Sequence, residues 1–236
     1  MSRTYIETFD SGPGGWLGWD SNAAGAKPIK IVDGVAISDG PWWVDYNHAP
    51  PGGGYLQLPF AIHTLQGPDF PQQYIDLGGV NHFAEGGFPT DFTNAKVTIR
   101  ARGEMKWRGA HVMLLIQGKV GDRYINYVLD AQPFTITPEW SESTIICEPD
   151  PAQWKCMGSR HDRMDFYGWD DVDKLLRDVN ADIILVHHPI DVVPLKPMPE
   201  EDLHRLRAGE EYELDPAHLP EGRWELDEVR IEFPNV

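Results

Sequence analysis

A short aromatic and polar segment between positions 42 and 48 carries side chains suited to sugar chemistry. The indole rings of Trp42 and Trp43 can stack on the apolar face of a sugar, while Asp45, Asn47 and His48 can hydrogen-bond its hydroxyl groups. Adjacent strand residues point to opposite faces, so we expect one tryptophan in the core and the other on a ligand face or under a loop. A buried aromatic pair followed by a polar turn is the alternative interpretation.

General acid-base catalysis needs a histidine oriented by a carboxylate, and Asp45 with His48 is the pair that the sequence offers first. His111 and Tyr124 complete the predicted catalytic set. Recognised catalytic signatures are missing. The strand that starts Glu225-Leu226-Asp227 begins like a glucanase Glu-x-Asp-x-Glu motif, but Val229 and Arg230 occupy the places where the final acid would stand. The sequence therefore leaves open whether the protein is an enzyme.

Short β-type runs with turn signals between them must position these side chains, and the 23 Gly and 20 Pro exclude a helical bundle. We expect short helices at Asp170–Asp178 and at Pro199–Arg207, the latter within an insertion at 199–223. The fold prediction is all-β, an antiparallel two-sheet jelly-roll sandwich with one or two short helices in connections, forming one domain over 1–236. The expected strands are Arg3–Phe9, Lys30–Val32, Val35–Ser38, Tyr55–His63, Lys96–Gly103, His111–Gly118, Tyr124–Ala131, Thr144–Cys147, Ile183–His187 and Glu225–Phe233.

The period-two alternation of these strands predicts a polar face on a concave sheet surface. In one strand Arg100 and Arg102 oppose an apolar face, and in another Asn126 and Asp130 do the same. The continuously apolar strand that follows His111 is expected at the centre of a sheet. We predict that the shared polar face binds substrate through Trp42, Trp43, Asn47, Arg100, Arg102, Asn126 and Asp130. An ordinary solvated face is the alternative, above all for the two arginines.

The two ends of the chain resemble the opening and closing strands of jelly-roll carbohydrate-binding modules and concanavalin-like lectin and glucanase domains. The resemblance rests on Glu7-Thr8-Phe9-Asp10-Ser11-Gly12 and on the strand that begins at Trp224. It implies that the terminal strands lie side by side, with a structural Ca²⁺ held by Glu7, Asp10 and Asp227. Acids that simply flank strands at the solvent edge are the alternative.

The amino-acid composition limits the classes of partner that the protein can bind. The formal net charge of −17 argues against nucleic acids and anionic membranes, whose binding requires clustered Lys and Arg. The sequence has no apolar h-region near Met1 and only two cysteines, which favours a cytoplasmic protein with reduced thiols.

Taken together, the sequence favours a carbohydrate-binding jelly-roll protein that recognises a saccharide or glycoside by aromatic stacking. A cytoplasmic hydrolase or lyase acting on sugars through a His/Asp pair is the alternative. An accessory subunit docked on such an enzyme, or a homo-oligomer, also remains open.

Overall fold

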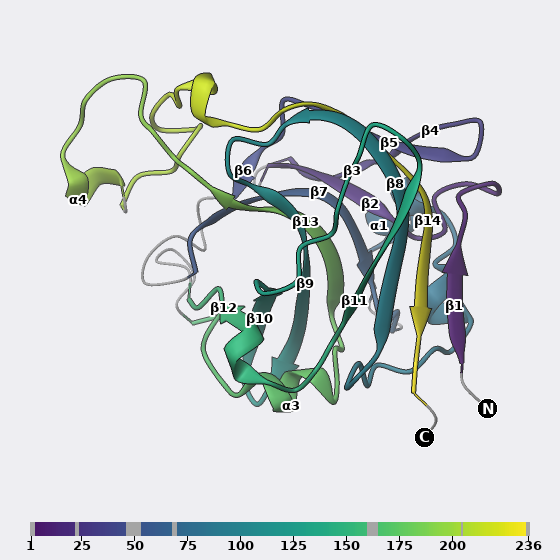
Figure 1. The fold of residues 1–236 in the computed structure, drawn as a ribbon. Coiled ribbons are helices and arrows are strands. Elements are labelled where there is room, and N and C mark those ends of the chain that lie inside the picture. The colour runs from purple at the N-terminus through teal and green to yellow at the C-terminus, as the bar shows by residue number, and fades with distance from the viewer. Residues whose placement is uncertain are drawn as a thin grey trace.

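The computed structural model describes residues 3–21, 24–45, 53–67, 70–159, 165–203 and 205–234. It confirms the predicted fold: an antiparallel two-sheet jelly-roll sandwich with short helices in its connections (Figure 1). The smaller sheet has six strands in the order β11-β8-β14-β5-β4, with β1 beside β14. Its strands are β1 (Thr4–Glu7), β4 (Lys30–Val32), β5 (Val35–Asp39), β8 (Lys96–Lys106), β11 (Ser141–Ile146) and β14 (Glu221–Glu232).

The larger sheet has eight strands in the order β12-β10-β9-β13-β7-β2-β3, with β6 beside β7. Its strands are β2 (Leu17–Ser21), β3 (Gly25–Pro28), β6 (Val44–Asp45), β7 (Tyr55–His63), β9 (His111–Val120), β10 (Arg123–Leu129), β12 (Trp154–Cys156) and β13 (Asp182–Ile190). The continuously apolar strand β9 lies inside this sheet between β10 and β13, as its sequence predicts.

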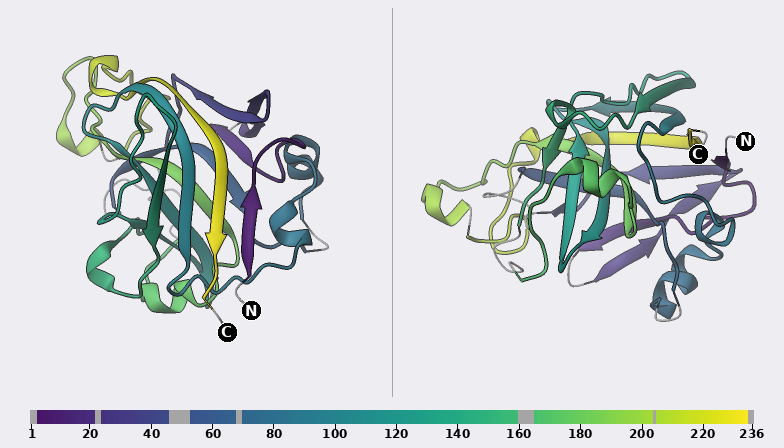
Figure 2. Two further views of the ribbon diagram at one scale, coloured as in Figure 1. Left: turned by 45° about the vertical axis from the view of Figure 1, so that its right-hand side comes forward. Right: turned by 90° about the horizontal axis from the view of Figure 1, so that it is seen from below.

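The connections hold α1 (Gln72–Gly78), α2 (His82–Glu85), α3 (Val172–Leu176) and α4 (Glu200–Leu203), with 3₁₀ turns at Pro151–Gln153 and Pro216–His218. The sequence predicts α3 and α4, although both are shorter than expected, and it misses α1 and α2. Between β13 and β14 the chain projects away from the sandwich at the end that carries α4 (Figures 1 and 2).

The first strand pairs over its whole length with the C-terminal part of the last strand, with Thr4 opposite Glu232 and Glu7 opposite Val229. The two chain ends accordingly lie close together (Figure 2). A bulge in β14 between Leu226 and Glu228 shifts its alternation by one residue. Because of this shift both Leu226 and Val229 point into the core.

The main hydrophobic core lies between the two sheets. Phe60 of β7 and Trp224 of β14 meet across it edge to face, with ring centroids 5.0 Å apart. Both are almost fully buried, and each contributes roughly 2–3 kcal/mol through removal of apolar surface from water.

The opposite face of the eight-stranded sheet, which we call the outer face, is also largely covered. A second cluster of buried apolar side chains lies on it, formed by Leu56, Ala61, Met113, Leu115, Val128, Met157, Ile184 and Val186. A sheet face covered in this way can form the floor of a ligand site.

Candidate functional site

A row of four polar side chains crosses the outer face from strand to strand. The antiparallel register places Asn126 of β10 opposite Gln117 of β9, Gln117 opposite Asp182 of β13, and Asp182 opposite His63 of β7. Directly opposed residues have their side chains on the same face, so the four form a continuous line across the sheet. We call it the polar row.

Contacts within the polar row centre on Asp182. His63 places Nδ1 against Oδ1 of Asp182, and Gln117 donates a hydrogen bond from Nε2 to Oδ2 at 3.0 Å. The carboxylate is thereby held from both sides. The side chains of His63 and Asp182 are 18% and 13% exposed, so each keeps some accessible surface.

Asn126 ends the polar row in an unusual state. The residue is completely buried, and neither its amide oxygen nor its amide nitrogen has a hydrogen-bond partner among the described residues. An unpaired buried polar group costs about 1–3 kcal/mol, so a side chain with two such atoms destabilises the folded state.

Aromatic rings surround His63 and restrict its orientation. Its ring lies 4.9 Å from that of Phe70 and 4.8 Å from that of Tyr74, and Trp19 packs beside Tyr74 at 6.3 Å. Burial among these groups by itself lowers the pKa of His63. The charge and hydrogen bond of Asp182 outweigh burial and raise the pKa above its ordinary value of 6.5.

A pocket opens beside the polar row and contains about 670 Å³ of empty space, counting the part open to solvent. Its lining extends from Asp45, which pairs with Leu56, to His63, seven residues further along β7. At about 3.3 Å per residue the lining residues are spread over about 20 Å of β7, and we call this pocket the groove. Its lining residues are Leu17, Trp19, Trp43, Asp45, Leu56, Leu58, Ala61, His63, Leu115, Gln117, Tyr167, Asp182 and Ile184.

The aromatic segment of the sequence divides between core and groove as its alternation predicts. Trp42 packs against the main core and donates its indole N–H to Ser38 Oγ at 2.8 Å, whereas Trp43 and Asp45 line the groove. The predicted site residues Asn47 and His48 lie outside the described residues, so the Asp45/His48 pair stays a prediction.

The alternation of β9 and β10 correctly places His111, Tyr124, Asn126 and Asp130 on one face of the eight-stranded sheet, since the intervening residues enter the main core. Of these, only Asn126 belongs to the polar row. Tyr124 stacks on Phe166, with ring centroids 4.5 Å apart.

His111 and Asp130 lie at the other end of this face. His111 is opposite His188, and the Asp130 carboxylate is 3.8 Å from Nε2 of that histidine. The structure thus does not join His111 and Tyr124 to Asp45 in one catalytic cluster.

The arginines require a correction. Arg100 and Arg102 belong to β8, which is part of the other sheet, so they cannot line the same face as Asn126. There they pair with Asp227 and Glu225 of the neighbouring strand β14. Both guanidinium groups also lie over the ring of Trp140, 4.9 and 4.5 Å from its centroid.

The predicted calcium ligands are not brought together either. Glu7 is buried, accepting a hydrogen bond from the Phe9 backbone N–H at 3.2 Å and contacting His82 Nδ1 at 2.8 Å. Asp10 is exposed, and Asp227 is paired with an arginine. Within the described parts of the chain, no group of three or more His, Cys, Asp or Glu side chains is arranged to hold a metal ion.

Sequence reasoning missed His63, Asp182 and Trp19. A signal existed, because His63 ends strand β7 and Asp182 begins strand β13, while Gln117 directly follows the apolar run at 112–116 in β9. Their approach depends on the order and register of β7, β13 and β9, which the sequence does not display.

Comparison with known proteins finds no matching family model, curated protein or solved structure. None of the helices in the described ranges has the length and apolar character needed to span a bilayer.

Proposed function

We propose that the groove on the outer face binds a saccharide or glycoside. The observation that carries the proposal is the combination of aromatic side chains, Trp19, Trp43 and Tyr167, with a polar row at one end of an apolar floor. Sugars present apolar ring faces and hydroxyl edges, so they need both kinds of surface at once.

The charge of the groove favours a ligand without anionic groups. Its described lining includes the carboxylates of Asp45 and Asp182 and one histidine, but no Lys or Arg. Phosphate and carboxylate ligands are recognised chiefly by arginine and lysine, so a neutral sugar fits better than a phosphorylated or acidic one. The overall charge of −17 acts in the same direction.

The two tryptophans of the groove lie beside the middle of its floor strand. Continuing the antiparallel registers that pair Asp45 with Leu56 and Leu17 with Ala61 brings Trp43 to the level of Leu58 and Trp19 to the level of Pro59. Two indole rings at this level of one groove can stack on the apolar faces of a bound saccharide. Catalysis on the bound sugar, the second function that the sequence raises, is favoured by the contact between His63 and Asp182 and is developed in the next subsection.

The proposed location is the cytoplasm. Cys147 and Cys156 are both free thiols, which fits a reducing compartment.

Binding is tested by isothermal titration calorimetry with maltotetraose, cellotetraose, laminaritetraose and xylotetraose. We expect at least one to bind, and Trp19→Ala to weaken it about tenfold, equivalent to about 1.4 kcal/mol of lost stacking. Trp169→Ala is the matched control, because Trp169 is 54% exposed and does not line the groove. The proposal fails if none of the four binds, or if both tryptophan variants weaken binding equally.

A further inference from the structure

We infer that His63 and Asp182 catalyse the interconversion of the two anomers of a reducing sugar whose end unit lies at the polar end of the groove. The inference rests on the proposed function and adds an activity and a substrate class to it: sugars with a free hemiacetal. The observation that supports the inference is the direct contact between the His63 imidazole and the Asp182 carboxylate, which both line the groove.

The pair is built as a positioned acid and base. Gln117 fixes Asp182 from the side away from His63, and Phe70 and Tyr74 flank the imidazole ring. A catalytic pair needs such supporting contacts, because small displacements of acid and base cost much of the rate. Both side chains nevertheless keep accessible surface, which a purely internal ion pair does not need.

The closeness of His63 and Asp182 selects the reaction. Hydrolysis of a glycosidic bond uses two carboxyl groups about 5–5.5 Å apart, or about 6.5–9.5 Å apart when water attacks from the opposite face. An acid and a base in contact with each other are too close to flank a glycosidic bond in that way. In a hemiacetal, however, one carbon carries both the ring oxygen and the hydroxyl oxygen, and adjacent groups can reach both.

The proposed step needs no cofactor or external reagent. Asp182 takes the proton of the anomeric hydroxyl, and the O–H electron pair forms the carbonyl bond. The bond between the anomeric carbon and the ring oxygen breaks, and the ring oxygen takes a proton from the His63 imidazolium. After rotation about the neighbouring C–C bond, the chain hydroxyl attacks either face of the carbonyl. It returns its proton to His63 while Asp182 returns the other proton to the new anomeric hydroxyl.

The imidazolium that the first step requires is the state of His63 that the site stabilises. Asp182 raises the pKa of His63 above its ordinary value, which favours the imidazolium near neutral pH. In the described part of the chain, the titratable side chains in contact with this ring are Asp182 of β13 and Tyr74 of α1. Proton transfer by positioned side chains accelerates reactions by about 10²–10⁴-fold.

The test is NMR exchange spectroscopy between the α and β anomeric protons of D-glucose, D-galactose and maltotriose, with and without protein. We expect exchange of at least one sugar to be accelerated well beyond buffer. His63→Gln and Asp182→Asn should each remove most of this acceleration, about 100-fold. His82→Gln is the matched control, because His82 also contacts a carboxylate, that of Glu7 at 2.8 Å, but does not line the groove.

A competition experiment needs no variant. The methyl glycoside of the accelerated sugar cannot open its ring, so it should occupy the groove and slow the catalysed exchange. Three outcomes overturn the inference: bound sugars whose exchange is not accelerated, acceleration that survives both His63→Gln and Asp182→Asn, or acceleration unaffected by the competitor. In all three the proposed binding function stands if calorimetry detects a ligand. If none of the reducing sugars or oligosaccharides binds, the proposed function itself fails and the inference with it.

Discussion

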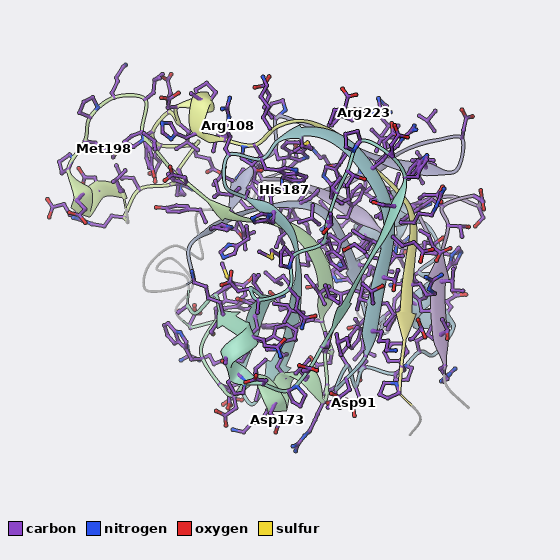
Figure 3. All side chains as sticks on the ribbon, in the orientation of Figure 1. Asp91, Arg108, Asp173, His187, Met198 and Arg223 are labelled. Atoms are coloured by element: carbon purple, nitrogen blue, oxygen red, sulfur yellow. The ribbon has the colours of Figure 1, made fainter. Side chains whose placement is uncertain are left out.

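The buried histidine of β13 makes the folded state sensitive to acid. His187 is fully buried between the sheets (Figure 3) and its Nδ1 lies 2.9 Å from Oε1 of Gln57. Trp224 donates its indole N–H to the other ring nitrogen, Nε2, at 3.0 Å. Gln57 Oε1 can only accept and the indole N–H can only donate, so His187 must be neutral with its proton on Nδ1. Burial lowers its pKa to about 3.

The size of the effect follows from the two protonation equilibria. The unfolded chain binds a proton at this histidine below about pH 6.5, whereas the folded protein does not until about pH 3. Stability from this group is therefore complete above pH 6.5 and is lost as the pH falls. The loss is about 1.4 kcal/mol per pH unit, or about 2.7 kcal/mol at pH 4.5.

His187→Gln is the variant that isolates this contribution, because an amide also supplies one donor and one acceptor but does not titrate. Urea unfolding of both proteins at several pH values between 7.5 and 4.5 gives the two stability curves. In the difference between the two curves, the contribution of carboxylates cancels because they titrate in both proteins. As the pH falls from 7.5 to 4.5, we expect the free energy of unfolding of His187→Gln to rise by about 2–3 kcal/mol relative to that of the original protein. Parallel curves would refute the neutral, buried state of His187.

Three further predictions concern the rest of the fold. Gly14→Ala should cost at least 1–2 kcal/mol more than Gly121→Ala, measured by urea unfolding, because both glycines have φ near +60° but only at Gly14 would the added methyl overlap the carboxylate of Glu7. Arg102→Ala should change the free energy of unfolding by at most about 1 kcal/mol and leave calorimetric sugar binding unchanged, because this half-exposed side chain lies on the other sheet. Cys147 should resist iodoacetamide at pH 8 until the protein unfolds, as mass spectrometry can show, because burial raises its pKa to about 12.

The alternation of apolar and polar residues predicts which way side chains point within a single strand. It correctly oriented Trp42 against Trp43, because neighbouring strand residues must face opposite ways. It also oriented Asn126 and Asp130 relative to the apolar residues between them. These statements need no knowledge of which strands are neighbours, which is why the sequence could supply them.

Alternation within a strand does not show to which sheet that strand belongs. Arg100 and Asn126 both oppose apolar faces in their own strands, yet β8 and β10 belong to different sheets. The same limit hid the contact between His63 and Asp182, which are separated by well over a hundred residues and meet only because β7 pairs with β13. Non-local pairing sets such contacts, and a single sequence records it only weakly.

Two histidines of the eight-stranded sheet show how position decides between structure and chemistry. His187 faces the core, where its partners are an amide and an indole, so burial acts alone and the ring stays neutral. His63 faces the groove and contacts the carboxylate of Asp182, so the same kind of burial is outweighed and the ring gains affinity for a proton. A histidine that burial keeps neutral near pH 7 contributes to the fold and not to proton transfer. A histidine that contacts a carboxylate beside a groove can exchange a proton with a ligand, and for that reason we propose the outer face of the sheet as the functional site.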